Sequence, residues 1–170
     1  RKKHGQLKSS NSNFVNENFE VLAEREFAIS KRLGINLSFS YIKIIKNEYI
    51  SINRDSIISK ANLREIDLLF LTEEGEILSI FPATNGEGAN VATRKILSAI
   101  HREIEKYLDV DNCILKVETL TYPSQLMDFD HMMVLINQFR SENVFLLKNS
   151  RLTENYYRKP SSNSGFNLSL

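Results

Sequence analysis

The spacing of hydrophobic and polar residues changes several times along the chain, and each change marks a new element. Apolar residues over 19–27 recur at helical spacing, and Gly34 is a typical end for the helix that they predict. From residue 37 apolar side chains alternate with serines, which predicts a strand running to about Ile45. The less regular residues that follow predict a short strand at 47–53 and a short helix at 54–62.

A β-hairpin is predicted for the middle of the chain. Two apolar runs, at 66–71 and 77–81, flank the short polar segment 72–75. Gly75 ends that segment, and glycine adopts the positive φ of such turns without a steric penalty. The pattern therefore predicts two antiparallel strands joined by a short turn.

The pattern beyond the hairpin predicts one long helix and then shorter elements. Apolar residues recur every four positions over 92–104, which predicts a helix reaching about residue 107. A strand at 113–121, a helix at 128–138 and a short strand at 143–148 follow. Helices that alternate with strands around a hairpin predict an α/β sandwich, in which helices flank a mainly antiparallel central sheet.

The charge balance limits the partners that this chain can attract. Lysine and arginine total 22 and aspartate and glutamate total 21, which gives a net charge of +1. No overall field would draw such a chain to nucleic acid, so we expect no DNA or RNA partner. The single cysteine, Cys113, excludes an internal disulfide and is typical of a reducing compartment. The longest apolar runs, such as 132–136, are far shorter than a membrane span.

Both ends of the chain are polar and irregular. Residues 1–13 include several lysine and arginine side chains, and we interpret them as a solvated leader or as a juxtamembrane segment on the cytoplasmic side. Residues 149–170 are rich in serine and asparagine with little periodicity, which predicts a flexible tail. We therefore expect a cytoplasmic domain over 14–148, either free or as the soluble part of a membrane-anchored protein.

A series of motifs surrounds the predicted hairpin. Arg64-Glu65-Ile66-Asp67 is followed after five residues by Glu73-Glu74-Gly75-Glu76-Ile77 on the turn, and Pro82 closes the second apolar run. This order and spacing resemble the centre of a GGDEF domain, the fold of diguanylate cyclases, in which an Arg-x-x-Asp pair stands five residues before the signature. The resemblance implies a nucleotide-cyclase-like sandwich over residues 14–148.

The signature itself departs from the family pattern. In active enzymes of the family its glycines admit GTP and an acidic residue binds Mg²⁺, whereas this chain has Glu73 and Glu74 at the glycine positions and Gly75 at the metal position. The metal-binding aspartate of the first strand is also missing, and Lys43 stands near its place. The resemblance therefore implies a pseudoenzyme with no catalytic residue, metal or cofactor, and with the degenerate signature Glu73, Glu74, Gly75, Glu76 and Ile77.

The Arg-x-x-Asp pair remains as a candidate binding site. In related proteins it forms the inhibitory site, or I-site, which binds cyclic di-GMP. Asp67 can accept hydrogen bonds from the guanine N1–H and amine, and Arg64 can donate its planar fork to O6 and N7 or to a phosphate. The ligand carries two negative charges, and the resemblance places a further basic residue on the next helix, at Arg94 or Lys95.

These features lead to one main hypothesis and to alternatives that the sequence leaves open. We expect a receptor for cyclic di-GMP, similar to the receptor domains of Pel-type exopolysaccharide systems, which regulates biofilm formation through exopolysaccharide synthesis proteins and can pair as a homodimer. The alternatives are a ligand-independent dimerisation or protein-interaction module and a domain with residual cyclase activity. In the former case Arg64 and Asp67 form a surface salt bridge, and Arg94 and Lys95 belong to the solvated face of a helix.

Overall fold

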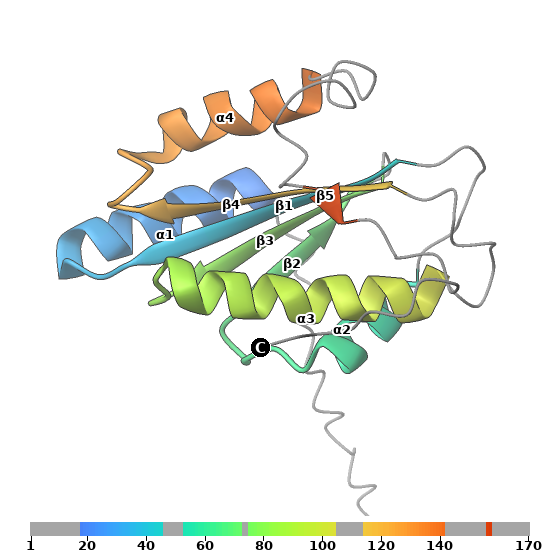
Figure 1. Cartoon of the computed structure of the whole chain (residues 1–170). Coiled ribbons are helices and arrows are strands. Elements are labelled where there is room, and N and C mark those ends of the chain that lie inside the picture. Colours follow the sequence, from blue (N-terminus) through green and yellow to red (C-terminus); the bar gives the residue numbers. More distant parts are fainter. Residues whose placement is uncertain (1–17, 46–52, 73–74, 105–113, 142–155, 158–170) are drawn as a thin grey trace, which may run out of the picture.

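The centre of the domain is an antiparallel sheet with the strand order β2-β3-β1-β4-β5 (Figure 1). The computed structural model describes residues 18–45, 53–72, 75–104, 114–141 and 156–157. All strand pairings in these ranges are antiparallel. The strands are β1 (Leu37–Ile45), β2 (Leu68–Leu71), β3 (Glu76–Pro82), β4 (Ile114–Tyr122) and β5 (Tyr156–Tyr157).

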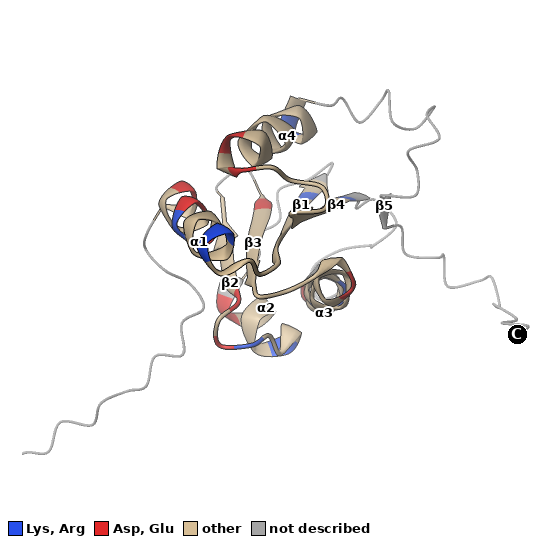
Figure 2. Cartoon of the chain, turned by 90° about the vertical axis from the view of Figure 1, so that its left-hand side faces the viewer, with Lys and Arg blue, Asp and Glu red and all other residues tan. Residues whose placement is uncertain are grey.

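Helices cover both faces of this sheet. In Figure 2 α1 and α4 lie on one side of the strands, and α2 and α3 lie on the other. The arrangement is the α/β sandwich with flanking helices that the sequence pattern predicts, so this prediction is confirmed. The helices are α1 (Phe19–Leu33), α2 (Arg54–Ala61), α3 (Gly86–Ile104) and α4 (Phe129–Ser141).

The side chains of the central strands alternate between two hydrophobic cores. Ile42 and Phe81 are fully buried in the core beneath α2 and α3. Phe39 and Ile80 are buried in the opposite core, where Leu22 of α1 contributes. Burial of each large apolar side chain contributes about 1.5–3 kcal/mol to folding. The two central strands, β1 and β3, are therefore held from both faces and fix the loops at their ends.

The ends of the helices match the polar and glycine residues at their boundaries. The Asn18 side chain accepts a hydrogen bond from the Glu20 amide at 3.0 Å and so caps α1 at its start. Gly34 ends α1 with a φ of 65°, as the sequence predicts. At the start of α3, the Asn85 side chain accepts a hydrogen bond from the Gly88 amide at 2.9 Å. These local contacts explain why the helix positions could be predicted within a few residues.

The predicted hairpin is formed by β2 and β3. Leu71 pairs with Ile77 in the antiparallel register, and the Thr72 amide donates to the Glu76 carbonyl oxygen at 2.9 Å. Gly75 has a φ of 77°, the left-handed conformation that the sequence analysis assigned to it. The described residues of the degenerate signature, Gly75, Glu76 and Ile77, therefore lie at the start of β3.

Some sequence predictions lie wholly or mostly outside the described residues. The strand predicted at 47–53 falls mostly in residues that are not described, apart from Asn53, which caps α2. The strand predicted at 143–148 is also outside them. Within 149–170, the described residues are Tyr156–Tyr157, which form β5 and pair with β4, and the flexible tail stays a prediction. None of the described helices is both long and apolar enough to cross a membrane.

Candidate ligand-binding site

The connection from α2 to β2 places Arg64 and Asp67 in one tight turn. α2 ends at Asn62, whose φ of 48° and ψ of 57° lie in the left-handed region that reverses the chain after a helix. The Asp67 amide donates to the Arg64 carbonyl oxygen at 3.0 Å. The Arg64 amide donates to the Asp67 carboxylate at 3.0 Å in return. Residues 64–67 therefore fold back on themselves and bring the two side chains together.

The side chains of Arg64 and Asp67 form a close ion pair. Arg64 Nη2 lies 2.6 Å from Asp67 Oδ1, and Arg64 Nε lies 3.2 and 3.3 Å from the two carboxylate oxygens. The Asp67 side chain is 2% exposed, whereas that of Arg64 is 49% exposed. The carboxylate is thus enclosed with both oxygens hydrogen-bonded, and the guanidinium is the part of the pair that a ligand can reach.

Thr84 holds the same guanidinium from the end of β3. Arg64 Nη2 donates to the Thr84 hydroxyl oxygen at 2.5 Å and to the Pro82 carbonyl oxygen at 3.1 Å. The Ser38 hydroxyl of β1 donates to the Thr84 carbonyl oxygen at 2.7 Å. Arg64 is therefore fixed against both central strands. The sequence analysis did not identify Thr84, because nothing in the local pattern relates it to Arg64.

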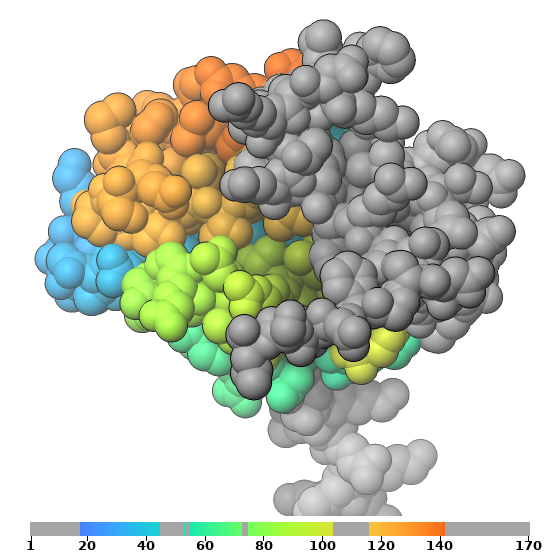
Figure 3. Space-filling model, viewed as in Figure 1, coloured from blue at the N-terminus to red at the C-terminus, as the bar shows by residue number. Residues whose placement is uncertain are grey.

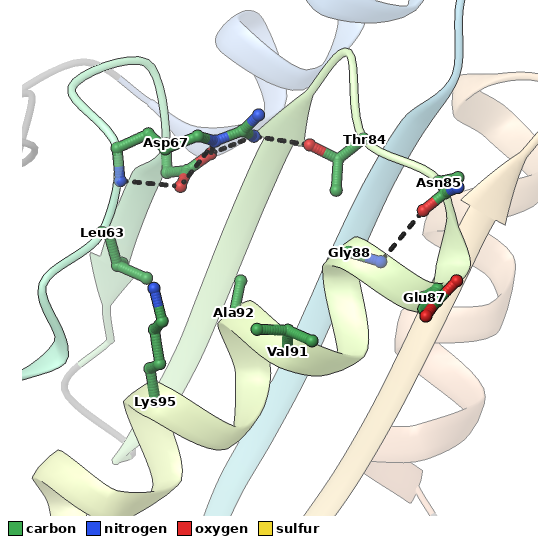
Figure 4. A pocket seen from close by; sticks show the side chains of 10 residues that line it. Leu63, Asp67, Thr84, Asn85, Glu87, Gly88, Val91, Ala92 and Lys95 are labelled. Carbon is green, nitrogen blue, oxygen red and sulfur yellow. Dashed lines mark hydrogen bonds and ion pairs between the residues drawn. The ribbon is translucent and has the colours of Figure 1, made fainter.

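A pocket of about 370 Å³ lies beside the Arg64 and Asp67 pair. The opposite wall belongs to α3, which contributes Val91, Ala92 and Lys95. Figure 4 shows the Lys95 side chain extending from α3, with Val91 and Ala92 next along the same helix. Asp67 and Glu87 also line the pocket, so two basic and two acidic side chains stand beside an apolar wall. Such a combination suits a flat base with hydrogen-bonding edges.

The structure distinguishes the two basic residues that the sequence proposed on α3. Lys95 lines the pocket of Arg64 and Asp67, and its Nζ donates to the Asn62 carbonyl oxygen at 3.5 Å. Arg94 lines a neighbouring hollow between α2 and α3 instead. Adjacent residues of a helix point about 100° apart, so Lys95 reaches both hollows whereas Arg94 lines the second one alone. Lys95 is therefore the residue that the fold brings together with Arg64 and Asp67.

The described part of the degenerate signature connects the sheet to α4. The Glu76 side chain is 2% exposed and accepts hydrogen bonds from the Tyr41 hydroxyl at 2.9 Å and from Arg140 Nε at 3.1 Å. Gly75 forms the turn, and Ile77 is buried in the core beneath α2 and α3. Glu73 and Glu74 are outside the described residues. Arg140 lies 64 residues from Glu76 along the chain, and no sequence signal joins the two.

The described residues offer no cluster of metal ligands. They contain no group of three or more His, Cys, Asp or Glu side chains that could hold one ion. β1 has no acidic residue, and Lys43 stands opposite Glu76 in the strand register. A hard cation such as Mg²⁺ needs several oxygen ligands, and the described residues of β1 and of the signature do not supply such a set.

Comparisons with known proteins identify the fold. No protein-family model matches the chain, and no curated protein matches it. The GGDEF domain of TpbB, also called YfiN, from Pseudomonas aeruginosa superposes with a TM-score of 0.53 and 17% identity, over 68% of this chain and 75% of that one. A DGC protein from Thermotoga maritima gives a TM-score of 0.49 at 13% identity, over 70% and 89% of the two chains. A fragment of PelD from Pseudomonas aeruginosa, in its apo form, gives 0.36 at 13% identity, over 79% and 46%.

Of these three similarities, the first has a TM-score above 0.5, and we base the fold assignment on it. The domain has a GGDEF-like fold, a mixed α/β arrangement with an antiparallel sheet between helices. This agrees with the resemblance that the motifs around the hairpin carry. At 17% identity the similarity concerns the fold, so the function has to be argued from the residues of the pocket.

Proposed function

We propose that this domain is a catalytically inactive GGDEF-like domain that acts as a receptor for cyclic di-GMP. In this proposal the Arg64 guanidinium contacts a guanine or a phosphate, Lys95 supplies a second positive charge, and Asp67 orients Arg64. The observation that carries the proposal is the shared pocket, into which two different elements bring Arg64 and Lys95. By resemblance to Pel-type systems, binding would regulate exopolysaccharide production, with a synthesis protein or a second copy of the domain as partner.

The chemistry of the pocket supports a guanine nucleotide as the ligand. A guanidinium offers several N–H donors in one plane and can form two parallel hydrogen bonds with guanine O6 and N7. Asp67, Thr84 and Pro82 already fix the plane of Arg64, so little side-chain entropy remains to be lost when a ligand binds. The net charge of the chain is only +1, and the acidic side chains of Asp67 and Glu87 line the pocket beside Arg64 and Lys95. In this proposal a dianionic ligand is therefore held by direct contacts with these two cations, and no overall positive field draws it in.

The absence of catalysis is part of the same proposal. Phosphoryl transfer by this fold needs carboxylates that hold two metal ions, and the metal position of the signature is Gly75. Glu76, the acid that remains among the described residues of the signature, is engaged by Tyr41 and Arg140. These observations support a domain that binds a nucleotide without converting GTP.

One observation favours a second candidate function, a ligand-independent dimerisation or protein-interaction module. The Asp67 carboxylate is 2% exposed, and both of its oxygens accept hydrogen bonds from Arg64. For Asp67 to contact guanine directly, the guanidinium would have to move away from it. If the ion pair only stabilises the turn, the domain has a partner surface and no nucleotide site.

A thermal-shift experiment separates the two candidates. The domain is heated with cyclic di-GMP, with cyclic di-AMP as the matched control, and with GTP and Mg²⁺. A ligand at a hundredfold excess over its Kd adds about 2.7 kcal/mol to the free energy of unfolding, so the melting temperature should rise for cyclic di-GMP alone. An unchanged melting temperature with every nucleotide would support the interaction module. Chromatography of the GTP sample tests for residual cyclase activity, for which we expect no product.

A further inference from the structure

A second hollow lies next to the pocket of Arg64 and Asp67, in the groove between α2 and α3. It measures about 420 Å³ and shares Val91 and Lys95 with the first pocket, so the two hollows adjoin. Its further lining includes Lys60, Arg94, Ser98 and Arg102. We call this hollow the α2–α3 groove. In Figure 3 the atoms of α3 form part of the outer surface of the domain, below β4 and α4.

The α2–α3 groove is strongly positive in a chain that is nearly neutral. Four cationic side chains line it and no acidic side chain does. One of the four, Lys60, donates to the buried carboxylate of Glu103 at 3.0 Å. The other three form no ion pair with the described residues, so a local excess of positive charge remains there, whereas the whole chain has a net charge of only +1. Such a local excess attracts anions within about 10 Å at moderate salt.

Contacts with the backbone of α2 hold two of these cations in place. Arg102 Nη2 donates to the Lys60 carbonyl oxygen at 3.3 Å, and Lys95 Nζ donates to the Asn62 carbonyl oxygen at 3.5 Å. Each contact uses only part of the donor capacity of its side chain, because arginine has five N–H donors and lysine three. The third, Arg94, is exposed and makes no hydrogen bond or ion pair with the described residues.

Three of the residues that line the α2–α3 groove lie in a row along α3. Val91, Lys95 and Arg102 are four and seven residues apart, which keeps them on one face of the helix. At 1.5 Å per residue, Val91 and Arg102 are separated by about 16 Å along the axis. A ligand with a base beside Arg64 would therefore find further positive charge in one direction only, along α3 toward Arg102.

We propose that the α2–α3 groove is a phosphate subsite continuous with the guanine pocket, and that the domain binds a linear guanine dinucleotide that ends in a phosphate. This inference rests on the proposed function, because it uses the same guanine pocket. A cyclic dinucleotide keeps both phosphates in one closed ring as singly charged diesters. A linear dinucleotide instead extends, and its terminal phosphate carries nearly two negative charges at neutral pH. In this proposal Arg94 contacts that terminal phosphate through charge-assisted hydrogen bonds, and Arg102, eight residues further along α3, adds to the positive potential around it.

Calorimetry with three ligands tests this subsite. The ligands are the linear guanine dinucleotide with a 5′-phosphate, the same dinucleotide without it, and cyclic di-GMP. For the wild-type domain, we expect the terminal phosphate to lower the Kd of the linear ligand by about tenfold or more. A tenfold change in Kd corresponds to about 1.4 kcal/mol, which one charge-assisted hydrogen bond can supply. Arg94→Ala should remove most of that gain, and Arg94→Glu should reverse it. Arg32→Ala, which removes an exposed arginine from α1, is the matched control and should keep the gain.

The outcomes separate this inference from the proposed function. The subsite proposal is wrong, and the receptor function stands, if cyclic di-GMP binds and the terminal phosphate does not increase the affinity for the linear ligand. The same holds if Arg94→Ala keeps the full increase in affinity. If the wild-type domain binds none of the three ligands, both fail. Circular dichroism of each variant verifies the fold, and Arg94→Ala removes no hydrogen bond or ion pair from the described structure.

Discussion

Asp67 accepts hydrogen bonds from both the backbone amide and the guanidinium of Arg64. One buried carboxylate thereby fixes the turn and the direction of the arginine side chain. In the proposed receptor, the Arg-x-x-Asp motif acts as one unit, with the aspartate as a positioning residue and the arginine as the contact residue. This arrangement leads to separate predictions for the two residues.

The first prediction concerns the planar fork of Arg64. Arg64→Lys keeps the positive charge but cannot form two parallel hydrogen bonds with guanine, so the affinity for cyclic di-GMP should fall about ten- to a hundredfold. Titration calorimetry of the variant and the wild-type domain measures this ratio. If Arg64→Lys binds cyclic di-GMP with wild-type affinity, a positive charge at this position is sufficient, and the guanidinium does not form two hydrogen bonds with guanine.

The second prediction concerns the buried end of the pair. Asp67→Ala removes the acceptor of the Arg64 amide and of the guanidinium, so we expect the free energy of unfolding to fall by about 1–3 kcal/mol. Glu65→Ala, at the exposed neighbouring position, is the control and should change it by about 0.5 kcal/mol or less. Urea denaturation of both variants gives these values. Equal stability of the two variants would mean that Asp67 does not organise the turn.

The third prediction concerns the ion pair between Glu76 and Arg140. Arg140→Ala leaves the buried Glu76 carboxylate with fewer donors, and we expect a loss of about 1–3 kcal/mol. Glu76→Gln keeps one acceptor oxygen for Tyr41 and Arg140 Nε but replaces the oxygen beside Arg140 Nη2 with an NH2 group. It should still cost less than Arg140→Ala, because it leaves no buried charge without its partner and Arg140 is partly exposed to water. A double-mutant cycle in urea isolates the coupling between the two residues. Additive effects would show that α4 is not held to the sheet through this pair.

The contrast between the turn of Arg64 and the contacts of Glu76 shows what the sequence could predict. Helix ends and the hairpin turn depend on residues close by in the sequence, such as Gly34 and Gly75. A short stretch of sequence is therefore enough to predict them. The pairing of Glu76 with Arg140 depends on how α4 packs across the sheet, and no short-range pattern encodes it. The choice between Arg94 and Lys95 likewise depends on the rotation of α3 against α2, which only the packed structure defines.

The fourth prediction concerns the turn of the hairpin. Gly75 has a φ of 77°, and an alanine there would meet no closer atom than the Ile44 carbonyl oxygen at 4.0 Å, so the cost is conformational rather than steric. Gly75→Ala should lower the free energy of unfolding by about 1–2 kcal/mol. Gly75→Asn should lower it less, because asparagine tolerates this region better. Equal losses for alanine and asparagine in thermal denaturation would contradict a left-handed turn.

The central claim is that Arg64 and its pocket bind cyclic di-GMP, and calorimetry with purified domain tests it most directly. Cyclic di-GMP is titrated into the wild-type domain and into Arg64→Ala, with circular dichroism to verify that both are folded. We predict saturable heat at micromolar ligand for the wild-type domain and a loss of about tenfold or more in affinity for Arg64→Ala. A folded wild-type domain that gives no heat at tens of micromolar ligand, or an Arg64→Ala variant that binds equally well, would contradict the account.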